Sequence, residues 1–434
     1  MLTLGCAKNE VDSDRMRTLL IQSGVEETQA FGDADVVIIN TCAFLEVASA
    51  KSIELILDAI EEQASCKIEA PVVVTGCLPS RYHQELTELL PEVSAFIPCN
   101  KEDDIVQVVS KATGVPLSCE ADLVHDVLRT DQGASAYVMI SDGCDRYCSF
   151  CAIPYIRGHY HSRKPESILD EVEELCARGT REIVLIGQDT GIWGRDFEEK
   201  KTLAWLLGEV AKRVRPYKGW VRVLYLQPEG MTDELIATIR DTDEILNYID
   251  MPIQHCNHEV LHRMRRSGST KEYAELFDRL RKEIPGMVLR TTGMVGFPGE
   301  TEQQFEELYS FVSDQGFDYT SVFAYSTEEG TAAAKLDGQI DADTKLEREQ
   351  ALRDLAETLG FAATAAHVGE VAEVIIDGVE QTDKGMEFIG HTWFQAPDCD
   401  GAVHIESGEA CVGDVVTCKL VDSFCYELIG EIVD

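Results

Sequence analysis

The sequence predicts an α/β protein of three parts: an N-terminal open parallel α/β domain, a central partial (β/α)6 barrel and a small C-terminal β-barrel. Strand-like and helix-like runs alternate over residues 1–112, which predicts a parallel sheet covered by helices. Six strand-then-helix repeats over residues 135–330 predict the partial barrel, whose active site would lie at the carboxyl ends of its strands. Val-rich alternation with many glycines over residues 368–434 predicts the small β-barrel or sandwich.

Changes in pattern along the chain set the expected boundaries. The expected domains cover residues 1–112, 135–366 and 367–434, with the polar, non-periodic residues 113–134 as a linker. An Ala- and Leu-rich helix is expected over residues 340–366. The expected strands are 2–4, 36–39, 72–75 and 93–97 in the first domain, 136–140, 182–187, 220–226, 247–251, 287–291 and 319–323 in the second, and 371–376, 402–405 and 415–420 in the third.

The composition is typical of a soluble globular protein. The 434 residues are 44% hydrophobic and 27% charged, and no apolar run reaches the roughly 20 residues that a membrane helix needs. The start, MLTLGCAKNE, lacks the basic and apolar regions of a signal peptide. Fifteen cysteines, an odd number, favour metal ligands, catalytic thiols or buried apolar side chains over a disulfide framework. We therefore expect a cytoplasmic protein with no membrane partner.

The net charge of −40 bears on the choice of partner. Nucleic-acid affinity comes mainly from Lys and Arg neutralising phosphates, so this charge makes nucleic acid an unlikely direct substrate, although a local basic patch could still bind RNA. A basic protein would be attracted and steered. A similar charge is also expected for solubility or for a salt-tolerant host, and these two interpretations are evenly balanced on charge alone.

The string GCDRYCSFC places Cys144, Cys148 and Cys151 just after the first expected barrel strand. Its C-x3-C-x2-C spacing lets one loop hold three irons of a 4Fe-4S cluster, which leaves the fourth iron without a protein ligand. Zinc normally takes four protein ligands in a structural site, and no fourth partner is present locally. This pattern resembles the radical S-adenosylmethionine (SAM) superfamily, in which the open iron chelates SAM.

The resemblance also suggests where SAM is bound. Phe150 stands where that superfamily has an aromatic residue before the last cysteine. Gln188 and Asp189 after the second barrel strand, and Gly296 in VGFPGET after the fifth, are further candidates for SAM contacts. A structural turn is an equally good interpretation of each of these later positions.

Three other cysteines share a context. Cys6, Cys42 and Cys77 each follow an expected strand of the N-terminal sheet. Parallel strands place their carboxyl ends on one edge, where open α/β sheets bind ligands, so the three thiols are expected to converge. Taken singly, each is more commonly a buried structural cysteine, but the shared position favours a second three-cysteine cluster site.

The strings LGCAKNEVDSDRM, NTCAF, TGCL and GCDRYCSFCAIPYIRG resemble methylthiotransferases over essentially the whole chain. That family joins an N-terminal cluster-binding domain to a radical SAM barrel and a C-terminal TRAM β-barrel. The resemblance implies that Cys6, Cys42 and Cys77 hold an auxiliary 4Fe-4S cluster whose open iron carries the sulfur to be inserted. It also implies a transferase with two 4Fe-4S clusters and SAM as cofactors, and a flavodoxin- or ferredoxin-like reductant.

The branches of that family differ in substrate. MiaB-type enzymes modify an isopentenylated adenosine in tRNA, and RimO-type enzymes modify the β-carbon of an aspartate in ribosomal protein uS12. The strings VFAYSTEEGT and IGHTWFQAPDCDGAVHI resemble the RimO type. Residues 367–434 contain fifteen acidic residues against Lys384 and Lys419, a balance of −13, which suits a basic protein better than RNA. The rival hypotheses are a MiaB-type tRNA enzyme and a non-catalytic iron–sulfur electron carrier.

The mechanism that the resemblance implies assigns the chemistry to the cofactors and placement to the protein. SAM cleavage yields a radical that removes hydrogen from the aspartate β-carbon, the auxiliary cluster supplies sulfur, and a second SAM supplies the methyl group. We therefore expect no catalytic acid or base. Arg290 in LRTT, and three arginines in HRMRRSG, are candidates for binding the substrate or SAM carboxylate by paired hydrogen bonds, although pairing with acidic neighbours is at least as good an interpretation.

Overall fold

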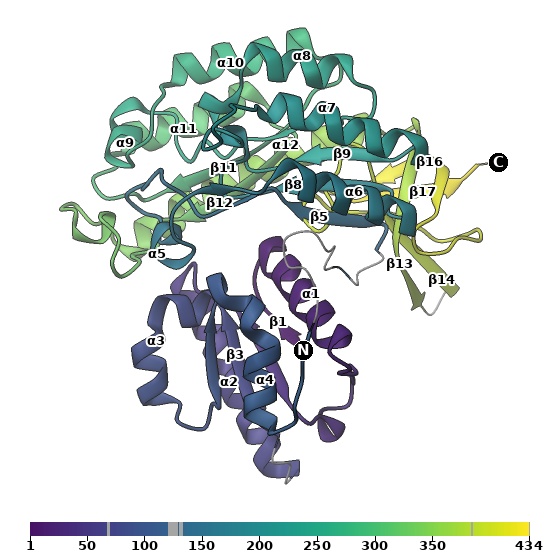
Figure 1. Ribbon diagram of the computed structural model, residues 1–434. Coiled ribbons are helices and arrows are strands. Elements are labelled where there is room, and N and C mark those ends of the chain that lie inside the picture. Colours follow the sequence, from purple (N-terminus) through teal and green to yellow (C-terminus); the bar gives the residue numbers. More distant parts are fainter. Residues whose placement is uncertain (67–69, 120–128, 130–132, 383–384, 434) are drawn as a thin grey trace.

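The computed structural model describes residues 1–66, 70–119, 129, 133–382 and 385–433, and Figure 1 shows their three-part arrangement. The expected linker at 113–134 falls largely outside the described residues. The first part is a four-stranded parallel sheet in the order β1-β2-β3-β4 with helices around it. Its elements are β1 (Leu2–Thr3), α1 (Ala7–Gln22), β2 (Val37–Thr41), α2 (Glu46–Cys66), β3 (Val72–Gly76), α3 (Cys77–Leu89), β4 (Ala95–Pro98) and α4 (Ile105–Thr113).

The second part contains the six expected β/α strands as two three-stranded parallel sheets, β5-β8-β9 and β10-β11-β12. An isolated parallel bridge from Val221 to Ile245 links β9 to the chain entering β10, so the six strands form an open, partial barrel. The strands are β5 (Ser135–Met139), β8 (Glu182–Ile186), β9 (Trp220–Val223), β10 (Tyr248–Asp250), β11 (Val288–Val295) and β12 (Tyr319–Ala324).

Helices cover the outside of this barrel (Figure 1). Pro165 begins α6 and Gly179 ends it in a left-handed conformation with φ +114°, as expected for a proline start and a glycine cap. The larger helices are α6 (Pro165–Arg178), α7 (Leu203–Val214), α8 (Asp233–Asp241), α9 (His258–Arg263), α10 (Thr270–Glu283), α11 (Glu302–Gln315) and α12 (Ala342–Ala366). Between β5 and α6 lie three short elements: β6 (Ser141–Asp142), α5 (Ile153–Ile156) and β7 (His161–Ser162).

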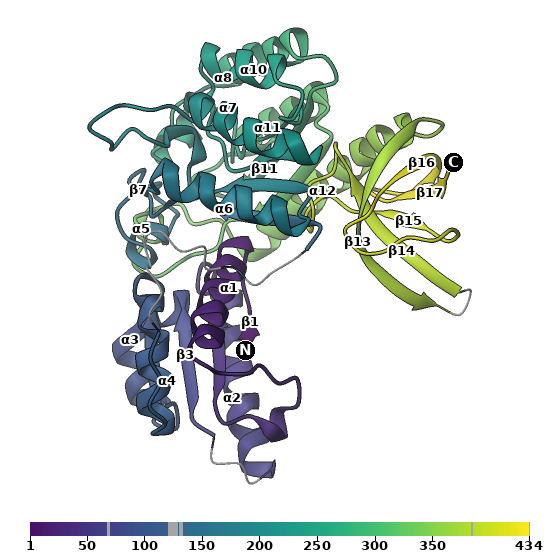
Figure 2. The same cartoon turned by 45° about the vertical axis from the view of Figure 1, so that its right-hand side comes forward.

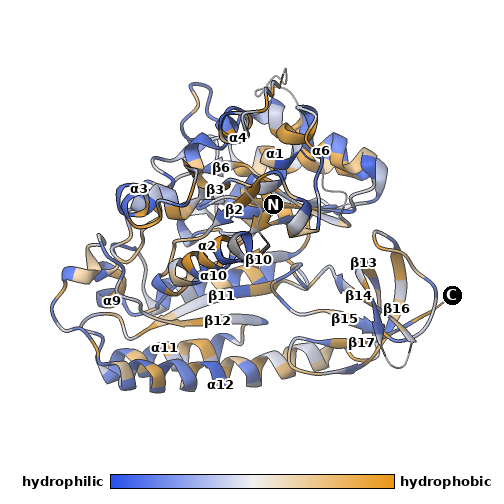
Figure 3. Cartoon of the chain, turned by 90° about the horizontal axis from the view of Figure 1, so that it is seen from below, coloured by the Kyte–Doolittle hydropathy of each residue, from blue (hydrophilic) through white to orange (hydrophobic). Residues whose placement is uncertain are grey.

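The third part is a closed five-stranded barrel in the order β13-β14-β15-β17-β16. Sequence patterns predicted three of these strands and missed β14 and β17. The strands are β13 (Val371–Thr382), β14 (Gly385–Thr392), β15 (Val403–Ile405), β16 (Val415–Ser423) and β17 (Leu428–Ile432). Helix α12 runs along the partial barrel to this closed barrel, and its first half is mostly hydrophilic (Figure 3).

The three parts share buried surface. The N-terminal domain lies below the partial barrel, and the closed barrel lies to one side (Figure 2). One buried apolar cluster contains Val11 of α1, Val184 of β8 and Val374 of β13, so it joins all three parts. Burial of such side chains is favourable by about 1.5–3 kcal/mol each, so separating the parts would be costly.

A buried polar cluster fixes the closed barrel to the partial barrel. His391 of β14 contacts Glu182 of β8 through Nε2 and lies 2.5 Å from Asp377 through Nδ1. Arg222 of β9 donates to the other Glu182 oxygen at 2.6 Å. Burial opposes protonation of His391, but the two carboxylates outweigh it and raise the pKa of His391 to about 9.

This pKa predicts that the chain loses stability between neutral and alkaline pH. The stabilisation from His391 should be complete below its ordinary value of 6.5 and should vanish as the pH rises through about 9, because folding binds a proton there. The loss should be on the order of 3 kcal/mol, measured as the free energy of unfolding in urea at several pH values. His391→Gln should flatten this dependence. His404→Gln, at a half-buried position of the same barrel, should leave it unchanged. A wild-type slope equal to that of His391→Gln would contradict the prediction.

Candidate functional site

Three N-terminal cysteines follow three adjacent parallel strands, as the sequence predicted. Cys6 precedes α1 just beyond β1, Cys42 follows β2 directly, and Cys77 follows β3 and begins α3. The turn into Cys77 needs the glycine before it. Gly76 has φ +97°, and a Cβ there would lie 2.2 Å from the Asn40 side-chain oxygen. We call Cys6, Cys42 and Cys77 the N-terminal triad.

The thiols of the N-terminal triad influence one another. Cys6 is exposed, Cys42 is half-buried and Cys77 is buried. Burial raises the pKa of Cys77 to about 12, and the nearby Cys42 and Cys6 add to this rise. Burial also raises the pKa of Cys42, with Cys6 contributing in the same direction. The three cysteines thus follow three neighbouring strands at one edge of the sheet.

The second triad lies on the loop after β6. The backbone N–H of Cys144 donates to Gly158 at 3.1 Å, and that of Cys151 donates to Cys148 at 3.0 Å. Ser149 fixes the loop to the barrel by donating from its hydroxyl to the Arg263 carbonyl at 2.8 Å. Burial raises the pKa of Cys151 to about 12, and Cys148 and Cys144 contribute to the rise. We call Cys144, Cys148 and Cys151 the barrel triad.

Neither triad has the geometry of a single-ion site. Among the residues that the structure describes, no three His, Cys, Asp or Glu side chains are arranged to hold one metal ion. A 4Fe-4S cluster differs because each cysteine binds a different iron, so its three thiolates need not converge on one point. Three thiols from one loop, or from three neighbouring strand ends, fit the donor set of such a cluster.

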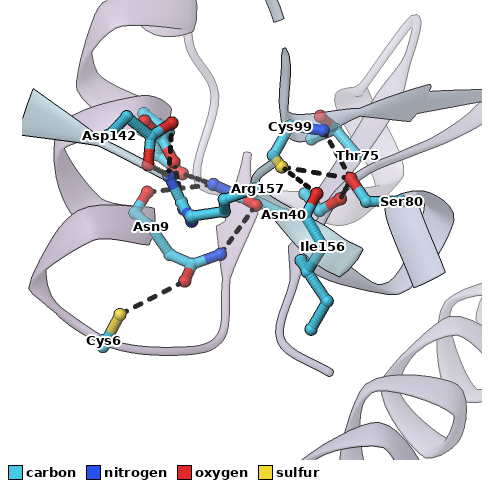
Figure 4. A network of polar contacts seen from close by, with 12 residues as sticks. Cys6, Asn9, Asn40, Thr75, Ser80, Cys99, Asp142, Ile156 and Arg157 are labelled. Atoms are coloured by element: carbon cyan, nitrogen blue, oxygen red, sulfur yellow. Dashed lines mark hydrogen bonds and ion pairs between the residues drawn. The ribbon is translucent and has the colours of Figure 1, made fainter. Parts of the chain in front are cut away.

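Arg157 connects the N-terminal domain to the partial barrel. Its guanidinium donates to Asp12 of α1 at 2.7 Å and to Asp142 of β6 at 3.3 Å, and only 5% of the residue is exposed. Burial alone would lower the pKa of Arg157, but the charges of Asp12 and Asp142 outweigh it and raise the pKa well above its ordinary value. Figure 4 shows Arg157 at the centre of this network, with Cys6 and Asn9 to one side and Cys99 to the other.

We predict that Arg157→Met lowers the free energy of unfolding by about 3–5 kcal/mol, because it leaves buried carboxylates without a counter-charge. The measurement is urea unfolding of the variant beside Arg15→Met. Arg15 also pairs with an aspartate, Asp103, at 2.7 Å, but at a largely exposed site. Its loss should cost about 1 kcal/mol or less. Equal losses of unfolding free energy in the two variants would contradict a stabilising role for the buried ion pairs of Arg157.

A fourth cysteine occupies the equivalent place on the last strand of the N-terminal sheet. Cys99 directly follows β4, but its thiol donates to the Ile156 carbonyl at 3.4 Å and accepts from the Ser80 hydroxyl at 3.1 Å. Burial raises the pKa of Cys99 to about 11. Its position shortly after the expected strand 93–97 is the signal that would have grouped Cys99 with the triad.

The predicted SAM contacts at Gln188 and Asp189 lie beside the barrel triad. Gln188 donates to Asp142 at 2.9 Å, and Asp189 is paired with Arg146, which belongs to the triad loop. The Gln188 side-chain oxygen and one Asp189 oxygen are buried and accept no hydrogen bond within the described residues. Such orphaned acceptors fit a bound ligand that brings donors, as the amino and hydroxyl groups of SAM would. Their contact with SAM stays a prediction.

The other two SAM candidates have structural partners. Gly296 has φ +70°, its N–H donates to both oxygens of Glu300 at 3.1 Å, and a Cβ there would lie 2.5 Å from Lys345. Phe150 packs against an apolar cluster that includes Phe297 and Tyr325. These contacts explain both residues without SAM, and the SAM contacts themselves stay predictions.

Arg290 is held at the junction with the closed barrel. It donates to Asp250 at 2.9 Å, to Asp400 at 3.0 Å and to Ser321 at 3.0 Å, so all three of its nitrogens are engaged. The pKa of Arg290 is raised, because these carboxylates outweigh burial. Arg266 similarly contacts Gln227 and the Pro252 carbonyl. A substrate role for Arg290 stays a prediction, and the described contacts favour a structural one.

Two residues that the sequence analysis did not single out lie at the interface. Arg157 stands six residues after Cys151, and Lys8 stands two residues after Cys6. The Lys8 ammonium lies 3.8 Å from the centre of the Tyr225 ring on the barrel. Burial lowers the pKa of Lys8. Each is a basic residue close in sequence to a cysteine motif, which is the signal that could have found it.

Comparison with known proteins gives the family. The Radical SAM superfamily model matches residues 138–312, the Uncharacterized protein family UPF0004 model matches residues 1–98, and the TRAM domain model matches residues 368–433. The chain is 39% identical to the ribosomal protein uS12 methylthiotransferase RimO of Trichlorobacter lovleyi, covering 100% of this chain and 98% of the relative. The chain belongs to the RimO family. The RimO proteins of Caldanaerobacter subterraneus, at 40% identity with 99% of each chain covered, and Geobacter sulfurreducens, at 39% with 100% and 98% covered, are similarly close.

Solved structures confirm the fold of the RimO-family chain. The radical S-adenosylmethionine methyltransferase TsrM from Kitasatospora setae superposes with a TM-score of 0.54 at 16% identity, covering 72% of each chain. The cobalamin-dependent S-adenosylmethionine radical enzyme OxsB gives a TM-score of 0.51 at 11% identity, covering 81% of this chain and 55% of OxsB. Among the described residues, none of the helices combines the length and the apolar character that crossing a lipid bilayer would require.

Proposed function

We propose that this chain methylthiolates the β-carbon of an aspartate in ribosomal protein uS12, in the cytoplasm. The observation that carries the proposal is the full-length match to RimO proteins, at 39% identity over 445 residues. The presence of both cysteine triads at strand ends supports it, because the reaction needs two separate cluster sites. We also propose the domain limits 1–112, 135–366 and 367–434, with residues 113–134 as the linker.

The proposed cofactors are two 4Fe-4S clusters and SAM. The N-terminal triad would hold the auxiliary cluster, and the barrel triad would hold the SAM cluster. When bound, these groups supply reductive cleavage of SAM and a sulfur atom for transfer. The protein's own part is to hold each cluster by three thiolates. Through Arg157, it also fixes the N-terminal domain against the partial barrel. A flavodoxin- or ferredoxin-like protein is the proposed electron donor.

The surface charge of the closed barrel supports a basic protein substrate over tRNA. Exposed acidic side chains are spread over its strands and loops: Glu370, Glu373, Asp377, Glu380, Asp398, Glu406, Glu409, Asp414, Asp422 and Glu431. Lys419 is the only Lys or Arg of this barrel among the residues that the structure describes. Nucleic-acid affinity comes mainly from Lys and Arg that neutralise phosphates, so this surface disfavours RNA and attracts a cationic protein.

Mass spectrometry of two candidate substrates tests the proposal. The chain is reconstituted anaerobically with iron, sulfide, SAM and a reductant, and then offered purified uS12 or an isopentenylated tRNA in parallel. We expect one methylthio group on a uS12 aspartate and none on the tRNA. The same group on the tRNA would establish the MiaB-type activity instead. Absence of product and of SAM cleavage in both tubes would favour a non-catalytic iron–sulfur protein.

A further inference from the structure

Lys8 is a buried cation at the interface of the N-terminal domain and the partial barrel. It lies in the first turn of α1, and 7% of its surface is exposed. Its ammonium sits 3.8 Å from the ring centre of Tyr225, a contact that holds the charge over a π face. Tyr225 is fixed in turn by its backbone N–H, which donates to Asp250 at 2.9 Å.

The basic residues around Lys8 already have partners. Arg157 is paired with Asp12 and Asp142, and Arg290 is paired with Asp250 and Asp400. Lys8 differs, because in the part of the chain that the structure describes it makes no hydrogen bond and no ion pair, and the Tyr225 ring is its contact. Burial of most of the side chain weakens the hydration of this charge, so an anionic partner would stabilise it.

Lys8 stands two residues after Cys6 of the N-terminal triad, and its ammonium contacts Tyr225 on the partial barrel, which carries the other triad. The electrostatic neighbours of its ammonium are Cys6 of the N-terminal triad, and Asp142 and Asp250 at the ends of β6 and β10. Asp142 immediately precedes the loop of the barrel triad, and it is already hydrogen-bonded by Arg157 and Gln188. An anionic ligand that reaches this interface would therefore meet Lys8 as a cation that has no ion-pair partner among the described residues.

We propose that Lys8 binds the side-chain carboxylate of the substrate aspartate, with Tyr225 positioning the ammonium. The inference rests on the proposed function. In aspartate the β-carbon is bonded directly to the carboxyl carbon, so an ion pair to the carboxylate fixes the β-carbon within one bond of the held group. Lys8 thus determines which carbon is presented between the N-terminal triad and the barrel triad.

A double-substitution binding experiment tests this role. The reconstituted chain and its Lys8→Met variant are each titrated with uS12 and with a uS12 variant that has Asn in place of the target Asp, and dissociation constants are measured. We expect wild type to bind the Asn form about 10- to 100-fold more weakly, because it lacks the charged hydrogen bond. Lys8→Met should bind both forms equally, at the weaker level. Lys51→Met, an exposed lysine of α2, should behave as wild type.

Two further measurements separate substrate binding from a structural role. Iron and sulfide contents of Lys8→Met should equal those of wild type. Loss of the N-terminal cluster from this variant would assign Lys8 to cluster retention and overturn the proposal. Tyr225→Leu removes the ring face and should reduce the discrimination between Asp and Asn forms by several-fold.

The outcomes also distinguish failure of the Lys8 inference from failure of the proposed function. If wild type discriminates and Lys8→Met discriminates equally well, the Lys8 inference is wrong and the proposed function stands. If wild type neither binds nor modifies uS12, the proposed function is wrong and the Lys8 inference falls with it.

Discussion

Cys148→Ala is expected to abolish reductive cleavage of SAM. Cys148 lies in the middle of the barrel triad, on a loop that backbone hydrogen bonds hold in place. The other two thiols of that loop, Cys144 and Cys151, are already assigned as ligands, so neither can replace it. Two thiolates cannot hold three irons of the cluster, and SAM then lacks the open iron that cleavage needs. The measurement is the amount of 5′-deoxyadenosine formed from SAM with dithionite as the reductant.

The control for this experiment is Cys411→Ala, an exposed cysteine on the closed barrel. It should form 5′-deoxyadenosine at the wild-type rate. Formation of 5′-deoxyadenosine by Cys148→Ala at even a tenth of the wild-type rate would show that the barrel triad is wrongly assigned.

Cys42→Ala is expected to stop sulfur insertion while SAM cleavage remains measurable. Cys42 belongs to the N-terminal triad, on a sheet separate from the barrel triad, so its loss removes the sulfur source and leaves the SAM site intact. Both products are measured in one reaction, 5′-deoxyadenosine by chromatography and methylthiolated uS12 by mass spectrometry. The first should persist, and the second should fall below detection.

Cys99→Ala is the matched control for Cys42→Ala. Cys99 follows β4, the last strand of the same sheet, but its thiol is already hydrogen-bonded to the Ser80 hydroxyl and the Ile156 carbonyl. It should retain methylthiolation. Full methylthiolation by Cys42→Ala, or its loss in Cys99→Ala with Cys42→Ala active, would exclude the assigned auxiliary site.

Much of this architecture could be predicted from local patterns. The runs VVIIN and VVVTG are short apolar segments followed by a cysteine, and each forms a buried strand, Val37–Thr41 and Val72–Gly76, that ends one residue before Cys42 or Cys77. Parallel pairing of adjacent strands then brings the thiols to one edge without any further information. The placement of the three cysteines at one edge of the sheet was therefore a consequence of strand order.

The strands of the closed barrel were harder to predict. Val371–Thr382 was expected to end at residue 376, but it continues past a bulge between Ile376 and Gly378 and pairs with the unpredicted β14. A bulge breaks the alternation of inward and outward side chains, so the pattern appears to stop where the strand does not. Strand β17 has Gly430 in its middle, and a glycine there weakens the apolar pattern by which a strand is recognised.

Contacts between domains lay beyond sequence patterns altogether. Arg157 and Asp12 are 145 positions apart, and His391 and Glu182 are 209 apart. Their pairing depends on how whole domains dock, and no local periodicity carries that information. The same holds for Lys8 and Tyr225, which are far apart in sequence and meet where the N-terminal domain contacts the partial barrel.

The central claim is that the chain has two independent cluster sites, one on each triad. Iron analysis of three proteins tests this claim. Wild type, a Cys6/Cys42/Cys77→Ala variant and a Cys144/Cys148/Cys151→Ala variant are reconstituted anaerobically, and iron and acid-labile sulfide are counted per chain. Two 4Fe-4S clusters give about eight iron in wild type and about four in each variant. Retention of the full wild-type iron in either variant, or loss of all iron from both, would contradict the assignment of one cluster to each triad.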